Sequence, residues 1–290
     1  MLSADRRKYF DPNRKVRILL SMENQFNGVV TRVCNWELEL IRLQLLDGVK
    51  PAELILPAAP VRQLVDALTH LLMTAYSAAV KQARWDLLIG KVLERGIVIP
   101  FAQTPPQTGD EFLPTVGLEW YQTYALRIAG VQQSDLLDRA KQEITNGIRA
   151  GSRQRDIEAA LAQVFNGLAR YRLANIARTE TAKIYEQAHY QEWQGNDDIS
   201  GYEVCAIMDG RTSEICLHRN GKVIPKDRIE GWWPPYHFSC RTTVVPVFAW
   251  ETPDWSVLDG PKPIAGFGTT RMEIPAVRGQ QAQRLIRTVS

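Results

Sequence analysis

The sequence predicts an α+β protein with a mainly helical N-terminal half, a helix bundle packed on a small antiparallel β lobe, and an extended C-terminal tail. Three observations lead to this prediction. Apolar residues recur at three- and four-residue steps through most of residues 36–194, which is typical of amphipathic helices. After residue 200 the pattern changes to the alternation of a strand. Residues 250–290 are rich in Pro, Gly and isolated hydrophobic residues, which form neither element.

The longest helical pattern begins after Pro60 and stops near Gly96. Its apolar stripe consists of Val61, Leu64, Val65, Leu68, Leu71, Leu72, Ala75, Ala79 and Ala83. Before this helix, residues 1–20 carry six basic and two acidic side chains. We expect them to form a solvated terminus, with an arm that contacts phosphates or an acidic partner as the alternative. A connector rich in Pro and Gly follows the helix at about residues 97–117.

The second half of the chain predicts shorter elements. A helix near 119–129 leads to Gly130, and three helical patterns follow within 133–194 with a soft break at Gly167. Strands are expected at 202–208 and 242–248, with a hairpin at Asn220-Gly221 and a short helix near 280–287. The chain therefore divides into a helical region (1–130), a compact domain (131–248) and a basic tail (249–290).

Composition excludes several classes of protein. Hydrophobic residues make up 45% and charged residues 23% of 290 residues, as in an ordinary globular protein and unlike a disordered one. No apolar run is long enough to predict a membrane span. The four cysteines form no CxxC pair, so a reducing compartment is the default expectation. There is no phosphate-binding GxxxxGK[ST] loop, GxSxG elbow or HExxH motif, and we predict no catalytic residue.

Two thiols and two imidazoles lie within 25 residues of each other, at Cys216, His218, His237 and Cys240. Four such ligands could close a tetrahedral zinc site, although the CxH…HxxC spacing is not that of a standard zinc finger. The alternative is that both cysteines are small buried hydrophobic residues and both histidines bond to loop backbone. Zinc is the one candidate cofactor that the sequence indicates.

A charged group in the same region predicts a structural clamp between helix and sheet. Glu180 lies in line with the apolar face of its helix, where an unpaired carboxylate is costly to bury. We expect Arg241, Arg211 or backbone N–H groups to pair with it, and we expect Asp209 and Thr212 to form a turn. The alternative is a catalytic or metal-binding role for the Glu180 carboxylate.

Residues 139–178 form the most basic internal block, with eight basic and three acidic side chains. Such a block is usually a solvated helix face. Together with the basic ends of the chain, it is also compatible with sequence-independent contact to the phosphates of double-stranded DNA. The candidate residues are Arg149, Arg153, Arg155, Arg170 and Arg172.

Three motifs together resemble a known family. They are Ile176-Ala177-Arg178-Thr179-Glu180-Thr181, then Asp209-Gly210-Arg211-Thr212 followed by Cys216, then Pro234-Pro235-Tyr236-His237-Phe238-Ser239-Cys240-Arg241. In this order they resemble the head morphogenesis domain of tailed bacteriophages, in the phage Mu F-like minor head protein family. The resemblance covers about residues 132–247 and includes Arg178 among the clamp residues.

One position departs from the family pattern. Many relatives have a cysteine directly after the D-x-R-T turn, where this chain has Ser213. A metal site would then need another fourth ligand, and His218 is the obvious substitute. The departure affects the expected metal and not the expected fold.

The resemblance implies a non-enzymatic structural protein of the virion, placed in the head interior or at the portal vertex and present in the host cytoplasm during assembly. The implied partners are the portal protein, the major capsid protein or scaffold, and double-stranded DNA without sequence preference; no membrane is implied. The implied roles are head assembly and DNA packaging or ejection. The alternative is a metal-dependent nuclease or other hydrolase that uses Glu180, Asp209, His218 and His237.

Overall fold

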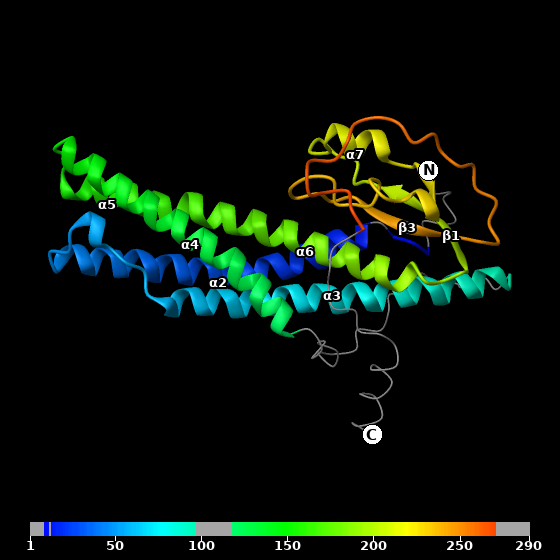
Figure 1. Ribbon diagram of the computed structural model, residues 1–290, viewed down its shortest axis with the longest axis horizontal. Helices are drawn as coiled ribbons and strands as arrows, with labels where there is room; N and C mark the ends of the chain where they lie inside the picture. Colours follow the sequence, from blue (N-terminus) through cyan, green and yellow to red (C-terminus); the bar gives the residue numbers. More distant parts are fainter. Residues whose placement is uncertain (1–8, 12, 97–117, 271–290) are drawn as a thin grey trace, which may run out of the picture. The chain divides into compact units, whose positions relative to one another are not determined.

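The computed structural model describes residues 9–11, 13–96 and 118–270, and it confirms the α+β class (Figure 1). Its helices are α2 (Asn13–Leu46), α3 (Ala58–Glu94), α4 (Leu118–Arg149), α5 (Gln154–Gln163), α6 (Arg170–Trp193) and α7 (Glu214–Arg219). Its strands are β1 (Ile199–Cys205), β2 (Val223–Pro225) and β3 (Thr243–Phe248). No helix in the described part of the chain has the length and apolar character that a membrane crossing requires. The expected connector at 97–117 and helix at 280–287 lie outside the described residues.

Two compact units make up the chain. Unit 1 consists of Met1–Leu20, Met73–Gly117 and Thr179–Ser290, and unit 2 consists of Ser21–Leu72 and Leu118–Arg178. The sheet and α7 belong to unit 1, whereas α4 and α5 belong to unit 2. The boundaries expected at about 131 and 248 remain predictions.

The N-terminal helix begins much earlier than the sequence pattern indicates. The structure starts α2 at Asn13, where the backbone N–H donates to Asp11 Oδ1 at 2.9 Å. The prediction of a solvated terminus was wrong for this stretch, because Lys15 is only 1% exposed and pairs with an acidic side chain. A buried lysine interrupts the apolar stripe, so the spacing of apolar residues does not predict this part of the helix.

Two glycines predicted as breaks lie inside continuous helical segments. Gly130 is in the middle of α4, and Gly167 is in a π-helical segment, η2 (Val164–Ala169), that connects α5 to α6. A helical glycine costs only about 1 kcal/mol relative to alanine. The buried stripe of α4 outweighs that cost, and it consists of Tyr121, Ala125, Ala129, Leu136, Ala140 and Ile144.

The sheet has the order β2-β1-β3 and is antiparallel throughout. Strand β3 agrees closely with the strand predicted at 242–248, whereas β1 lies three residues before the one predicted at 202–208. The predicted hairpin at Asn220-Gly221 was wrong. The residues before this dipeptide form α7, and Gly221 takes a φ of +79° after the helix ends. The Asn220 side-chain oxygen accepts a hydrogen bond from the N–H of Ala206 at 2.9 Å. Because Ala206 directly follows β1, this bond holds the end of α7 against the end of that strand.

Buried aromatic rings form the core of unit 1. Trp233 is fully buried, and its ring centroid lies 5.0 Å from that of Tyr202, 5.2 Å from that of Tyr190 and 6.4 Å from that of Trp193. The indole N–H of Trp233 donates to the backbone oxygen of Glu186 at 3.2 Å. This ring therefore joins the Pro234 loop to the sheet and to α6 with its one polar atom satisfied.

The segment that follows β3 extends along the same lobe without regular structure (Figure 1, orange). Arg219, which is 3% exposed, donates to the backbone oxygens of Gly231 (2.7 Å) and Pro261 (2.9 Å), and its guanidinium lies over the rings of Trp232 and Tyr236. A buried guanidinium is tolerated when oxygens and aromatic faces replace its water. The extended segment is thus tied to the aromatic core.

Candidate functional site

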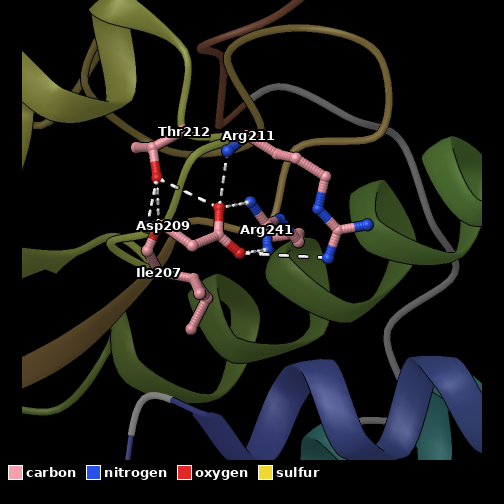
Figure 2. A network of polar contacts seen from close by, with 5 residues as sticks. All are labelled: Ile207, Asp209, Arg211, Thr212 and Arg241. Carbon is pink, nitrogen blue, oxygen red and sulfur yellow. Dashed lines mark hydrogen bonds and ion pairs between the residues drawn. The ribbon is translucent and has the colours of Figure 1, made fainter.

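A tight turn between β1 and α7 presents the Asp209 carboxylate (Figure 2). The Asp209 N–H donates to Thr212 Oγ1 and the Arg211 N–H donates to Asp209 Oδ1, both at 2.9 Å. The Thr212 hydroxyl donates to the backbone oxygen of Ile207 at 2.5 Å. Because short polar side chains satisfy the N–H groups of the turn, the D-x-R-T pattern specifies its shape locally.

Arg241 holds this turn to the loop before β3. Its two terminal nitrogens each donate to an Asp209 oxygen at 2.6 Å, which is the bidentate geometry of a strong arginine–carboxylate pair. Arg211 approaches the same carboxylate only to 3.9 Å and is 83% exposed (Figure 2). The hydrogen bonds from Arg241 hold the pKa of Asp209 well below its ordinary value, with a further contribution from the Arg211 N–H.

We predict that Asp209→Asn destabilises the protein at neutral pH and has little effect in acid. The pKa of Asp209 is lowered in the folded state, so its stabilisation is complete above its ordinary value of 3.8 and is lost as the pH falls through the lowered value. Urea unfolding between about pH 7 and pH 2 should therefore show a difference from wild type that shrinks below about pH 4. A difference that stays constant over this range would exclude the ion pair as its cause.

Three of the four candidate metal ligands come together beside this turn. Cys216 Sγ lies 3.1 Å from His237 Nε2 and 3.7 Å from Cys240 Sγ, and all three atoms are within 4.8 Å of one another. Both cysteines are buried and neither forms a disulfide. Cys216 is in the first turn of α7, while the other two come from the loop after Pro235, so the cluster joins two separate segments.

Ser213 completes the group, and sequence reasoning did not assign it a role there. It is the N-cap of α7, and its hydroxyl lies 2.8 Å from His237 Nε2. His237 Nδ1 lies 2.8 Å from the backbone oxygen of Phe238, which can only accept, so Nδ1 carries a proton. In the neutral ring Nε2 therefore presents its lone pair to the cluster, and in the protonated ring Nε2 donates to it.

Hydrogen bonds within the cluster separate the pKa values of its two thiols. The bond with Cys240 raises the pKa of Cys216, and burial raises it further. Burial acts in the same direction on Cys240, but hydrogen bonds from Cys216 and His237 outweigh it and place the Cys240 pKa well below its ordinary value. The pKa of His237 is raised, chiefly by its bond with Cys240. The two thiols and the imidazole therefore each influence the pKa of the others.

The structure does not place His218 with these residues. Its Nε2 lies 2.9 Å from the backbone oxygen of Asp259, and the ring is packed against Gly260, where a Cβ would lie 2.1 Å from that nitrogen. Leu217 and His218 follow Cys216 on α7, and two residues along a helix turn a side chain to a different face. His218 therefore contacts the extended segment and not the thiol cluster.

The other clamp residues also have separate partners. Glu180 pairs with Lys183 on the same helix at 3.1 Å, and Arg241 pairs with Asp209, as described above. Arg178 belongs to unit 2, where its Nε donates to Glu23 at 2.9 Å. Besides the Trp233 bond to Glu186, a contact between α6 and the loop comes from Thr179, whose Oγ1 accepts a hydrogen bond from the N–H of Ser239 at 2.9 Å.

Ser239 has a φ of +54°, which is unusual for a residue with a side chain. Its bond to the buried Thr179 compensates for this conformation and aligns the neighbouring Cys240. Thr179 stands in the Arg178-Thr179-Glu180 motif, and the sequence argument assigned a role to the neighbouring Glu180 carboxylate but none to this threonine.

The four residues of the nuclease hypothesis do not converge. Glu180, Asp209 and His218 each have the separate partners given above, and only His237 belongs to the thiol cluster. Within residues 9–11, 13–96 and 118–270, the cluster of Cys216, His237 and Cys240 is the one group of three or more such ligands with the geometry to hold one ion.

The candidate DNA-contact arginines are all exposed. Arg149 ends α4, and Arg153 and Arg155, which are 72% and 71% exposed, lie at the start of α5 with Asp156 no closer than 3.7 Å. Arg172 is partly neutralised, because its guanidinium pairs with Asp135 at 3.1 Å. Of these ion pairs, that of Arg172 is the shortest.

Unit 1 also contains a buried polar cluster that sequence analysis missed. Lys15 Nζ lies 2.7 Å from Glu186 Oε1, with both side chains 1% exposed. Nearby, burial raises the pKa of Asp86 to about 8 and lowers the pKa of His189 to about 4. These residues adjoin or line a small pocket bounded by α2, α3, α6 and β3. Because these residues lie as far apart in the sequence as positions 15 and 189, no local sequence pattern could predict that they come together.

Comparison with known proteins gives one match. Residues 138–245 match the family described as Phage Mu protein F like protein. No curated protein and no solved structure matches the chain. The matched segment contains the Asp209 turn, the thiol cluster and the Thr179 contact, and it confirms the resemblance stated from the three motifs. Residues 138–245 are therefore a phage Mu F-like region, and the match supports a head morphogenesis protein of that type.

Proposed function

We propose that this chain is a minor head protein of a tailed bacteriophage, that it associates with the portal protein, and that it acts in head assembly and in DNA packaging or ejection. The observation that carries the proposal is the family match over residues 138–245. A head morphogenesis protein works with other head components in the virion, and the family is generally structural. The major capsid protein or scaffold is the second proposed partner.

The site geometry is consistent with a structural role. Asp209 and Arg241 satisfy each other, and the thiol cluster joins α7 to the loop before β3. Structural ion pairs shift pKa values as catalytic groups do, so the lowered pKa of Asp209 is also what a structural pair would produce. The exposed arginines of α4 and α5 provide a surface for contacts with DNA phosphates.

The proposal is tested by placing the protein in the assembled particle. We expect mass spectrometry of purified heads to detect the chain at low copy number, and co-purification with the portal protein when the two are expressed together. The gene order should place a portal gene upstream and a protease or coat gene downstream. A chain missing from purified heads that contain the other structural proteins would exclude the proposed role.

We also predict weak, salt-dependent binding to duplex DNA. Replacing Arg153 and Arg155 with glutamine should weaken binding and reduce the slope of log affinity against log salt by about 1.8, because each phosphate contact contributes about 0.9. Fluorescence anisotropy with a labelled duplex at several salt concentrations measures both quantities.

A second double variant controls for net charge. Arg62 and Arg228 are exposed arginines outside the basic block, and replacing both with glutamine removes the same charge. This variant should bind DNA with the salt slope of the wild type. Equal slopes for the two double variants, or binding that is insensitive to salt, would show that the block has no specific role.

A further inference from the structure

We propose that Cys216, His237 and Cys240 bind one zinc ion, with the Ser213 hydroxyl beside the fourth coordination position. The proposal rests on the positions of these four side chains, all in unit 1, and is independent of any role in a phage head. Zinc binding would connect α7 to the loop before β3 at a point where no disulfide does so.

The spacing of the ligand atoms fits a tetrahedral ion. Zinc–sulfur bonds of about 2.3 Å and zinc–nitrogen bonds of about 2.0–2.1 Å place neighbouring ligand atoms about 3.5–3.8 Å apart. The two sulfurs are separated by 3.7 Å, and Cys216 Sγ and His237 Nε2 by 3.1 Å. A shift of a few tenths of an ångström brings the imidazole to the expected distance from Cys216, and its distance to Cys240 Sγ is within 4.8 Å.

The surroundings of the ligands also prepare them for a metal. The bond between His237 Nδ1 and the backbone oxygen of Phe238 fixes the ring orientation and leaves the Nε2 lone pair directed at the sulfurs, as in most histidine–zinc sites. The bond from Ser239 to Thr179 fixes the residue before Cys240. Two thiolates and an imidazole are ligands that select zinc over magnesium or calcium.

Ser213, and not His218, lies near the fourth coordination position. The Ser213 hydroxyl lies 2.8 Å from His237 Nε2, whereas the His218 ring is bonded to the Asp259 backbone. A serine hydroxyl is a poor zinc ligand, so the ion in this chain would complete its shell with water or with this hydroxyl. A cysteine at position 213 would place a third sulfur at the same corner.

The experiment measures zinc bound to the full chain after purification under reducing conditions and removal of metal by a chelator. We expect one zinc ion per chain by elemental analysis, and the absorption of a tetrahedral thiolate site when cobalt replaces zinc. Cys240→Ser and Cys216→Ser should each weaken zinc binding by more than about 100-fold, since even the loss of an outer-shell partner costs about 10- to 100-fold. Competition with a chromophoric chelator measures this change.

Ser213→Cys provides a test that does not depend on damaging the fold. It should bind zinc more tightly than the wild type, and its cobalt spectrum should show stronger sulfur-to-metal charge transfer. Two controls should bind zinc as the wild type does. Cys205→Ala removes a buried cysteine outside the cluster, and His218→Ala removes the histidine expected from sequence alone.

Three outcomes would overturn the proposal. The first is a folded, reduced wild-type chain that binds no zinc at a stoichiometric concentration. The second is loss of zinc binding in Cys205→Ala equal to that in Cys240→Ser, which would indicate general unfolding. The third is a disulfide between Cys216 and Cys240 in freshly purified protein, because a disulfide needs a sulfur separation of about 2.05 Å and leaves no thiolate for a metal.

Discussion

Replacing Lys15 with methionine is expected to lower the free energy of unfolding by about 3–5 kcal/mol, because it leaves a buried carboxylate without its counter-charge. Lys15 Nζ lies 2.7 Å from both Glu186 Oε1 and the backbone oxygen of Thr242. Burial raises the pKa of Glu186, and Lys15 and Thr243 oppose that shift. Denaturation by urea, followed by circular dichroism, measures the loss.

Two variants separate the ion pair from other effects. In Lys15→Met combined with Glu186→Leu both charges of the pair are removed, so this double variant should be clearly more stable than Lys15→Met alone. Arg17 lies two residues further along the same helix and pairs with Asp11 at the surface. Arg17→Met should change stability by less than about 1 kcal/mol. A large loss in Arg17→Met would attribute the effect to helix α2 and not to the buried pair.

Trp233→Ala should cost about 3–5 kcal/mol, the usual range when a buried tryptophan is truncated. The ring is 0% exposed and contacts the rings of Tyr202, Tyr190 and Trp193. Removing it leaves a cavity among rigid aromatic neighbours that cannot collapse into the space. Chemical denaturation gives the energy, and hydrogen exchange in β1 should rise at the same time.

Trp250 is the matched control for this substitution. Its ring stacks on that of Phe248 but is 42% exposed. Trp250→Ala removes the same number of atoms and should cost clearly less, because much of that surface remains in water in the folded state. Equal losses in the two variants would show that burial in the aromatic core is not what determines the cost.

The sequence predicted those parts of the fold whose causes are local. The long stripe of α3, from Val61 to Ala83, and the apolar run of β3 repeat at the period of their element, so their existence and type follow from pattern alone. The N-terminal half of α2 failed this test because Lys15 occupies a core position. Its partner Glu186 is 171 positions away, and no local pattern could reveal the pairing.

The candidate site shows the same division. The Asp209 turn and the proximity of Cys216, His237 and Cys240 follow from short-range motifs and their order. The partner of His218 does not, because it depends on which face of α7 meets the extended segment. The partner of Glu180 is local, since Lys183 lies three residues further along α6, but the expected partners were Arg241, Arg211 or backbone N–H groups. Ser213 was noted as a departure from the family pattern, but its place beside His237 Nε2 became visible only in three dimensions.

The contacts of Arg219 define how far the folded lobe extends. The family match stops at residue 245, yet this guanidinium takes one of its oxygens from Pro261, and Lys222 and His218 bond to Asp259 in the same way. A protein shortened to the limits of the match would expose the aromatic core and strip three basic side chains of their acceptors. The folded lobe therefore continues past residue 261, and Thr270 still bonds to Glu230, so its extent is set by these contacts and not by the end of the sheet.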